Sequence, residues 1–480
     1  MWQPVLMING FIIFILGIMM VIPALALKYY TGTLDLIFLR CAGLSMFIGG
    51  LMFLANFGKI KSISIMQGYL ITVVCWFSAL LFAAMPLYGN GDIVTIHDAL
   101  FEAASGITTT GATILNNVEA QPKSVLLWRA MINGLGGIGI VIFAVALMPF
   151  LGIGGMHIFN KENSDTEDKF LPKIRYIAKD IIIAYVLLNI ACAVFLKWAG
   201  MNWFDAVAHA LSTLCTGGFS TKNSSVGTFD SPLIEVIISV FMLFGAMPLT
   251  FFVILAKKKT LTSLFSNPQV NIFLRNVFII ILSVSGFYAY TKDVAFLRAL
   301  REVSFNVISA ITTTGFTSCN FLAWGPWTVI LFVMLAMHSG CTGSTSGSIK
   351  VYRWHVVWEF FKKNLTKSLS PNQVVVMKIG DKIIDDDTVS SVFVLVISFI
   401  CMTFFAAALV SLTGEDFTTS VGAIAVTITS FGSGLTDATG PLGNFAGFTP
   451  FAKFVITMAM MLGRLEIVTV LVLLRKIKFF

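Results

Sequence analysis

The sequence contains few charged residues: only 12% of its 480 residues are Asp, Glu, Lys or Arg, whereas 57% are hydrophobic. A soluble globule of this length could not cover its surface with so little polar area, so the composition excludes a soluble globular protein. No hydrophilic stretch exceeds roughly thirty residues, and a folded domain needs about 50. These 480 residues therefore leave no room for a soluble catalytic or nucleotide-binding domain.

Cysteine and histidine are also scarce. The seven Cys show no CxxC spacing and fall mostly in apolar runs, where Cys behaves as a small hydrophobe. Neither a metal centre nor a disulfide framework is expected. The five His form no HxxxH pair and no nucleophile–base pair, so the sequence argues against a membrane-embedded enzyme.

Long apolar runs are abundant. Runs of about 20 apolar residues, enough to cross the hydrocarbon layer as a helix, recur from end to end. Ten spans are predicted, near residues 4–27, 36–57, 63–87, 124–149, 180–199, 232–256, 272–291, 326–361, 389–412 and 450–474. The expected fold class is an all-α polytopic membrane protein in a lipid bilayer.

Positive charge is distributed unevenly over the connections between these spans. If the N-terminus is cytoplasmic, most Lys and Arg fall in the cytoplasmic segments, which are 59–61, 161–179, 257–275, 350–382 and 475–478. Basic residues near helix ends are held on the cytoplasmic side, so we expect this orientation. The same rule explains the net charge of +8 without a nucleic-acid partner.

A sequence repeat runs through the chain. Three segments read alike, SGITTTGAT, STLCTGGFS and SAITTTGFT, and aligned without gaps they superpose Gly111, Gly218 and Gly315. A weaker copy, TITSFGSG, places Gly432 in the same column, with Gly434 as the alternative. Each interval between these glycines contains two spans, so the repeated unit is span, pore loop, span.

The segment before each glycine predicts a short helix. Thirteen residues upstream stand Asp98, Asp205, Glu302 and Thr419, which suit the first turn of a helix. About twelve residues remain before the glycine, enough for three turns but too few to cross the membrane. We expect half-membrane pore helices that enter from outside and point their partially negative carboxyl ends inward.

The expected organisation is therefore an extra N-terminal helix pair followed by four pseudo-symmetric repeats around one pore. The helix pair covers 1–62, and the repeats cover 63–150, 173–258, 270–368 and 386–480, with pore loops near 98–116, 205–223, 302–320 and 416–440.

The loop centres suit the coordination of a dehydrated alkali cation. Such an ion needs several oxygen ligands, which backbone carbonyls supply, and turning carbonyls toward an axis requires angles that Gly adopts cheaply. A single ThrThrGly more often only ends a helix, but four copies at one topological position favour a filter. The predicted filter residues are Thr109, Thr110, Gly111, Thr216, Gly217, Gly218, Thr313, Thr314, Gly315, Phe431 and Gly432.

Five residues after each glycine lies a predicted outer mouth. Its members are Asn116, Asn223, Asn320 and Asp437. Asp437 is the one acid of this column, and an exposed acid there would concentrate cations at the entrance.

Two features of the later spans predict a gate. The eighth span is interrupted by HSGCTGSTSGSIK at 338–350, and Gly costs about 1 kcal/mol per helical residue relative to Ala. We expect this run to form an intramembrane loop below the filter, with a tolerated kink as the alternative. Arg464 stands within the last span, where a charge costs roughly 2.5–3.5 kcal/mol, and is expected to face the pore. The predicted gate residues are Gly340, Gly343, Gly347, Lys350 and Arg464.

Two further sites are assigned structural interpretations. Arg129, closer to a span end, is expected either to snorkel to the interface or to have a structural role. The pattern Gly134-x-Gly136-x-x-Gly139 lies within a span and has no preceding strand, so it indicates close helix packing rather than a dinucleotide site.

With these loops, the sequence resembles the superfamily of potassium transporters that includes TrkH, KtrB and plant HKT proteins, over essentially the whole chain. The two extra spans before the first repeat and the segment WRAMINGLGGIGI at 128–140 resemble the TrkH branch. The resemblance implies one filter glycine per repeat, a gating loop at 338–350 and an Arg below the filter, at Arg464. Gly111, in place of the Ser associated with sodium selectivity, favours potassium.

The resemblance also implies an assembly. It suggests a homodimer in the bacterial inner membrane with one pore per subunit, docked on a ring of cytosolic TrkA-type subunits. A nucleotide, NAD or ATP/ADP, is then expected only on that partner, and this chain needs no cofactor beyond potassium as its substrate. The expected function is potassium uptake through a channel-like pore. The alternative is a proton- or sodium-coupled symporter that uses acids such as Asp180 or Glu235.

Overall fold

The computed structural model describes residues 2–58, 64–146, 167–258, 267–380, 382–436, 438–441 and 443–477. These residues are mostly helical, and the strands among them are two residues long. Seven of the helices are long and apolar enough to cross a membrane, or nine spans result if each of two bent helix pairs is counted as one. The predicted all-α membrane fold is confirmed.

The described residues of the N-terminal pair and of the first two repeats contain helices and no strand of their own. The pair is α1 (Gln3–Thr31) and α2 (Leu36–Asn56). The first repeat contains α3 (Ile65–Ala84), α4 (Ile96–Ile107) and α5 (Lys123–Ala146). The second contains α7 (Glu167–Trp198), α8 (Trp203–Leu214), η2 (Ser225–Phe229), α9 (Pro232–Ala246) and α10 (Leu249–Lys258).

The third and fourth repeats contain the strands. The third repeat has α12 (Pro268–Lys292), α13 (Phe296–Ile311), η3 (Phe321–Trp324), α14 (Trp327–Met337) and α15 (Val351–Leu369). Between α14 and α15, β1 (His338–Ser339) pairs in parallel with β2 (Ile349–Lys350). An antiparallel pair, β3 (Lys378–Ile379) and β4 (Lys382–Ile383), precedes the fourth repeat. That repeat consists of α16 (Asp386–Ser411), α17 (Phe417–Ile428), α18 (Pro450–Arg464) and α19 (Ile467–Ile477).

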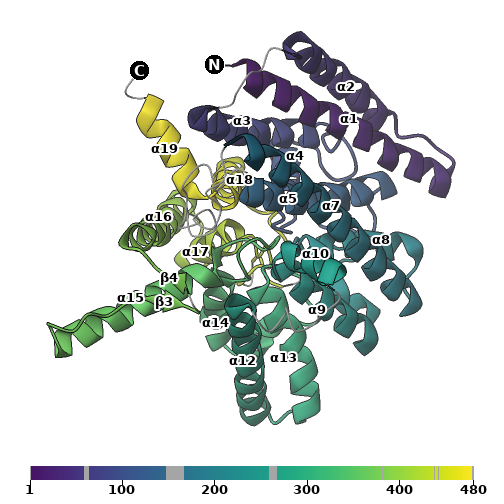
Figure 1. Cartoon of the computed structure of the whole chain (residues 1–480). Coiled ribbons are helices and arrows are strands. Elements are labelled where there is room, and N and C mark those ends of the chain that lie inside the picture. Colours follow the sequence, from purple (N-terminus) through teal and green to yellow (C-terminus); the bar gives the residue numbers. More distant parts are fainter. Residues whose placement is uncertain are drawn as a thin grey trace.

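The four short helices α4, α8, α13 and α17 surround the centre of the molecule (Figure 1). The second long helix of each repeat packs against the short helix of the next, as α5 on α8, α9 on α13, α14 on α17 and α18 on α4. The last of these contacts joins the fourth repeat to the first. The repeats therefore form a closed ring, and α1 and α2 lie outside it, packed on α3 and α5 through α1.

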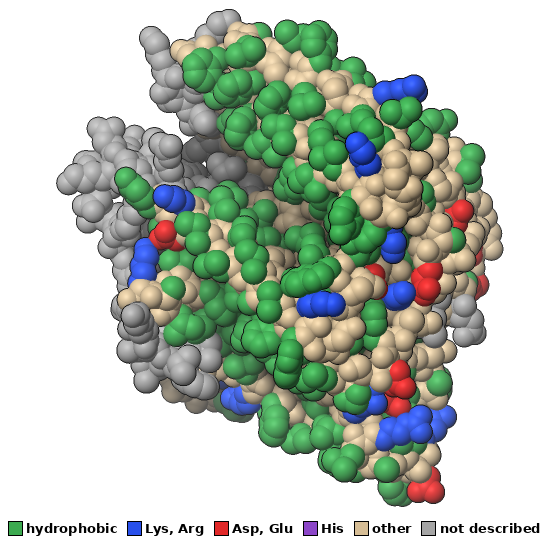
Figure 2. Space-filling view, turned by 90° about the vertical axis from the view of Figure 1, so that its right-hand side faces the viewer, with side chains coloured by type: hydrophobic (Ala, Val, Ile, Leu, Met, Phe, Trp, Pro, Cys, Tyr) green, Lys and Arg blue, Asp and Glu red, His purple; other side chains and the backbone are tan. Residues whose placement is uncertain are grey.

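The outer surface of the ring is apolar. Large hydrophobic side chains such as Phe14, Phe47, Leu187 and Phe278 are exposed. Figure 2 shows hydrophobic side chains over the middle of one face, with most charged side chains toward its right-hand edge. This distribution is what a lipid bilayer requires of a spanning protein.

Close packing of helices depends on glycine at the predicted place in α5. A Cβ at Gly136 would lie 1.9 Å from the carbonyl oxygen of Ile107, at the end of α4. Gly245 and Gly463 approach the last carbonyls of α8 and α17 in the same way, at 2.7 and 2.1 Å. Gly139, in contrast, faces open space. The packing interpretation of the glycine pattern therefore holds for Gly136.

Three predicted spans are not straight helices. The span at 232–256 bends by 94° between α9 and α10, and the span at 450–474 bends by 95° between α18 and α19. The first bend follows from Pro248, because the residue before a proline is pushed out of the helical region, and Met247 is extended. The third, at 326–361, is broken as predicted: α14 ends at Met337 and α15 begins at Val351.

The four pore helices begin largely as the sequence indicates. Asp98 and Asp205 lie in the first turn of α4 and α8, while Thr95, Asn202 and Asp416 supply the side-chain caps. Glu302 is an exception, because α13 starts at Phe296 and places it in the second turn. This helix has no side-chain cap, and its extension is supported by the i,i+4 ion pair of Glu302 with Arg298.

Candidate functional site

The four loops that follow the pore helices share an unusual backbone. Two residues before each aligned glycine, Thr109, Thr216, Thr313 and Ser430 have φ between 53° and 58°. The aligned glycines Gly111, Gly218, Gly315 and Gly432 have φ between 69° and 85°. Left-handed angles cost a β-branched residue such as Thr on the order of 1–3 kcal/mol and are concentrated at functional sites. Four copies of this strained pair indicate a site rather than simple helix caps.

The glycines bring neighbouring repeats into backbone contact. A Cβ at Gly111 would lie 2.3 Å from the carbonyl oxygen of Gly217, and one at Gly218 would lie 2.1 Å from that of Thr314. The series continues from Gly315 to Phe431, at 2.0 Å, and from Gly432 back to Thr110, at 1.9 Å. Each glycine thus faces the carbonyl that precedes the glycine of the next repeat, and the four contacts close a ring.

The fourth position of this ring is occupied by Gly432. Gly434, the alternative in the sequence, does not have a left-handed φ among the described residues. It packs instead against Thr439, whose carbonyl oxygen would lie 2.2 Å from an added Cβ.

The side chains behind the ring hold the loops against their own pore helices. Thr108 Oγ1 donates to the carbonyl of Ala104 and lies 2.8 Å from Thr110 Oγ1. The third repeat reproduces this arrangement with Thr312 and Thr314, also at 2.8 Å. The hydroxyls are therefore engaged away from the ring, which leaves the carbonyls to face it.

A cavity of about 70 Å³ lies beside the ring, among the segments that follow the four glycines. We call this the outer side of the ring, after the predicted orientation, and the opposite one its inner side. The four aligned glycines line it together with Thr113, Thr317, Arg129 and Lys222. The sequence did not single out Lys222, which lies 3.9 Å from Glu119.

The predicted outer-mouth residues join adjacent segments instead of standing free. Asn223 accepts a hydrogen bond from the backbone of Val118 at 2.7 Å. Asn116 accepts one from Asn444 at 3.1 Å, and Asn320 caps η3. Asp437 lies outside the described residues.

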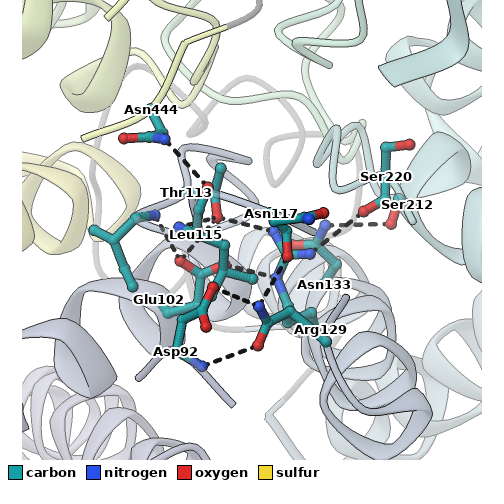
Figure 3. Close-up of polar contacts among 12 residues, drawn as sticks. Asp92, Glu102, Thr113, Leu115, Asn117, Arg129, Asn133, Ser212, Ser220 and Asn444 are labelled. Carbon is teal, nitrogen blue, oxygen red and sulfur yellow. Dashed lines mark hydrogen bonds and ion pairs between the residues drawn. The ribbon is translucent and has the colours of Figure 1, made fainter. Parts of the chain in front are cut away.

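Arg129 does not snorkel; it forms a buried ion pair next to the outer cavity. Its Nε lies 2.6 Å from Glu102 Oε1, and the two side chains are 2% and 0% exposed. Arg129 also donates to the carbonyl of Ser220 at 3.3 Å and to Thr113 Oγ1 at 3.2 Å. Figure 3 shows the pair among its partners from the first and second repeats. Arg129 therefore ties two neighbouring loops to one pore helix.

Glu102 belongs to a further column that sequence reasoning missed. Nine residues before each aligned glycine stand Glu102, His209, Asn306 and Ala423. Glu102 accepts from the backbone N–H of Ile114 at 3.0 Å. His209 Nε2 lies 2.9 Å from Ser220 Oγ, and Asn306 Nδ2 donates to Ser318 Oγ at 2.9 Å.

These three side chains brace the segment that follows each glycine from behind. We call Glu102, His209 and Asn306 the brace residues; Ala423 has no polar atom to play this part. The ungapped alignment that located the glycines contains the column as well.

On the inner side of the ring, residues 340–348 form a loop closed at its base. The parallel pairing of β1 with β2 joins the two ends of this loop. Cys341 N donates to the carbonyl of Ala246 at 2.9 Å, and Thr345 N donates to that of Gly245 at 3.1 Å. Both carbonyls are left without helical partners by the bend after α9. The bend in the second repeat thus creates the acceptors that anchor the loop.

The loop also touches the backbone just below the glycine ring. Gly347 N donates to Thr313 Oγ1 at 2.8 Å, and Thr345 Oγ1 donates to the carbonyl of Leu214 at 2.8 Å. A Cβ at Gly347 would lie 2.6 Å from the carbonyl oxygen of Thr429. The loop is therefore in contact with the second, third and fourth repeats.

Arg464 is the last residue of α18 and is 3% exposed. Its Nη2 donates to the carbonyl of Thr345 at 2.8 Å. Glu466 stands two residues later, a spacing that predicts no contact on a helix, and it does not pair with Arg464. Its Oε1 lies 2.7 Å from Arg353 Nη2 instead. A cavity of about 40 Å³ is lined by Arg464 and by Gly343, Gly347 and Lys350.

The remaining predicted gate residues have distinct positions. Gly340 packs on the carbonyl of Ala246, and the carbonyl of Gly343 accepts from Leu249 N at 3.2 Å. Lys350 donates to the carbonyl of Ser346 and to its Oγ, the latter at 3.1 Å. All five gate residues thus contact the loop or belong to it.

Comparisons with known proteins agree with this geometry. The family TrkH, described as a cation transport protein, matches residues 35–479. The chain is 34% identical to the Trk system potassium uptake protein TrkH of Halomonas elongata over 477 residues, 98% of each chain. It is 30% identical to the protein of the same name of Escherichia coli K12 over 476 residues, also 98% of each.

A solved structure is similar over the same length. The crystal structure of the potassium transporter TrkH from Vibrio parahaemolyticus superposes with a TM-score of 0.89 and 29% sequence identity. The match covers 99% of this chain and 98% of that one.

Proposed function

Because the chain belongs to the TrkH family of cation transport proteins, we propose that it takes up potassium through a pore whose selectivity filter is the glycine ring. The observation that carries this proposal is the closed series of four glycines, each facing a carbonyl of the next repeat. The relatives named above are potassium uptake proteins. A member of a cation transport family is not an enzyme in the usual sense.

The electrostatics of the ring suit a cation. Four pore helices end next to it, at Ile107, Leu214, Ile311 and Ile428, and a helix carboxyl end has a partial negative charge. Carbonyl dipoles supply oxygen ligands without the fixed charge that would trap an ion. Water-free coordination by such groups favours a weakly hydrated alkali cation.

A substitution at the first glycine tests the filter. In Gly111→Ser, the added Cβ would lie 2.3 Å from the carbonyl oxygen of Gly217, so that carbonyl must shift. We expect sodium permeation to rise relative to potassium in vesicles of purified protein. Gly139→Ser is the matched control, since a Cβ there meets nothing within 4 Å. An unchanged ion preference in folded Gly111→Ser would refute the role of Gly111.

We further propose that the loop at 340–348 and Arg464 together gate this pore. The loop touches three repeats below the ring, and an Arg near the path repels cations while its donors hold a loop carbonyl. Arg464→Ala, or a shortened loop, should therefore raise potassium flux measured without any regulatory partner. Arg298→Ala, at an exposed Arg, serves as the control. Basal flux equal to that of the unmodified protein in both variants would place the gate elsewhere.

The proposed partner rests on the names of the relatives. They are described as parts of a Trk system, which supports cytosolic TrkA-type subunits that bind the nucleotide; the homodimer stays a prediction. The basic connections support a bacterial inner-membrane location with the N-terminus in the cytoplasm. Labelling of single introduced cysteines from either side of the membrane tests the orientation, and co-purification tests the partner.

Coupled symport receives less support. Asp180 pairs with Lys257 and Glu235 pairs with Arg301, and neither carboxylate lines the two cavities described above. A carrier carboxylate would have to lie along the path. A flux assay with and without a proton gradient separates the two mechanisms, because channel-like flux follows the potassium gradient alone.

A further inference from the structure

The inner cavity contains more positive than negative charge. Lys350, Arg353 and Arg464 line it, and among the described residues Glu466 is the acid in its wall. Glu466 Oε1 accepts from Arg353 Nη2 at 2.7 Å, whereas its Oε2 has no hydrogen-bond partner among the described residues. One carboxylate thus stands against three basic side chains, so the described wall of the cavity has an excess of positive charge.

Arg464 has hydrogen-bond donors without a partner among the described residues. Its Nη2 is bonded to Thr345, but its Nε and Nη1 have no partner among the described residues. The side chain is 3% exposed, so bulk water does not satisfy them. An unpaired buried guanidinium donor is costly, which indicates that a water molecule or an anion occupies the space beside it.

The size of the cavity limits what that ligand is. About 40 Å³ is available, and a single water needs about 10–15 Å³ by such a measure. The space therefore admits a monatomic anion but not the phosphate chain of a nucleotide. Ser348 Oγ, which also lacks a partner, adds a neutral donor to the wall.

We propose that this cavity binds a chloride ion, held between Arg464 of α18 and Lys350 at the base of the loop. Such an ion would bridge the loop to the fourth repeat. Because the site exists only while the loop is in place, chloride stabilises the closed loop by mass action. This effect on flux rests on the proposed gating function, whereas the binding of the ion does not.

Bromide in crystals of the full-length protein tests the site directly. We expect an anomalous peak in the cavity within hydrogen-bonding distance of Arg464 and Lys350, and its loss in Arg464→Gln. Arg298→Gln, at an exposed Arg, should keep the peak. Bromide peaks elsewhere with only water density in this cavity would overturn the proposal.

Potassium flux without a regulatory partner tests the consequence. If chloride is present at ten times its Kd and binds only the closed loop, replacing it by gluconate raises basal flux about tenfold. Lys350→Gln should reduce that ratio toward one. If bromide binds but basal potassium flux is the same in chloride and in gluconate, the link between the anion and the gate is overturned. Bound bromide with no potassium flux in any salt would refute the proposed function and support the anion site.

Discussion

The first and fourth repeats support their loops of the glycine ring in different ways. In the first, the buried pair of Glu102 and Arg129 holds the loop from behind, with the two side chains 0% and 2% exposed. In the fourth, Ala423 stands where Glu102 would be, and Gly434 packs directly on the carbonyl of Thr439. The fourth repeat therefore replaces a side-chain brace with close backbone contact.

The fourth repeat also depends on the first for support. Phe445 N, which follows the fourth filter loop, donates to the carbonyl of Thr113 at 2.8 Å. Asn444 Nδ2 donates to the carbonyl of Leu115 at 3.3 Å. The fourth loop is thus hydrogen-bonded to the segment that Glu102 and Arg129 hold in place. Since Arg129 also holds Ser220 of the second repeat, we infer that the charged brace supports the loops of three repeats, the first, the second and the fourth.

The largest expected effect comes from breaking the charged brace. Glu102→Gln leaves Arg129 buried without a counter-charge, and losing one partner of such a pair costs about 3–5 kcal/mol. We expect that loss in the free energy of unfolding in mixed micelles, together with weaker potassium selectivity. Arg298→Gln breaks an exposed pair and should cost under about 1 kcal/mol. Equal losses in the two variants would contradict a special role for the first repeat.

A smaller effect is expected from crowding the fourth repeat. Gly434→Ala places a Cβ 2.2 Å from the carbonyl oxygen of Thr439, and overpacking of this kind costs about 1–3 kcal/mol. Potassium selectivity should fall with it, measured as the ratio of potassium to sodium flux. Gly447→Ala is the control, because its Cβ meets nothing within 4 Å. If both substitutions are silent, backbone contact is not what supports this loop.

The brace of the third repeat should matter less than the charged one. Asn306→Ala leaves Ser318 Oγ without its 2.9 Å partner, which costs about 1–3 kcal/mol for a buried polar group. Thermal unfolding and the ion flux ratio measure the result. Asn364→Ala removes a similar bond to the carbonyl four residues earlier at an exposed position and should change neither. If Asn306→Ala lowers the free energy of unfolding as much as Glu102→Gln does, a charged brace is no more important than a neutral one.

The smallest effect is expected where no brace exists. Ala423→Ser adds a hydroxyl that is able to bond to the helix carbonyl four residues earlier, so the change in stability should stay under about 1 kcal/mol. The flux ratio should remain that of the unmodified protein. A marked gain in selectivity would show instead that the fourth loop lacks a brace it needs.

The glycine ring could be predicted from the sequence because its signal is local and repeated. Each pore helix ends four residues before its glycine. The left-handed angle of Gly111 is one that glycine adopts easily, and glycine is visible in the sequence. The brace column was visible in the same alignment. The pairing of Glu102 with Arg129 was not, because the two residues stand 27 positions apart and meet only in the folded ring.

The bends were missed for a different physical reason. Hydropathy measures how apolar a run of residues is, but it does not show whether the helix that forms there is straight or bent. Met247 before Pro248 did contain a local signal of the first bend. No proline marks the second, where Glu466 has φ 56° and pairs with Arg353, 113 residues away. That break depends on a tertiary contact that no window of sequence contains.

The contact of α18 with α4 joins the last repeat to the first. The contacts around the ring therefore do not require one particular repeat to come first in the chain. Both α1 and α19 pack on α3, so the two ends of the chain meet at the same helix. A circularly permuted chain, with these ends joined by a linker and new termini between α10 and α12, would still form every interface between neighbouring repeats. We expect the contacts of the closed ring to form whichever repeat comes first in the permuted chain.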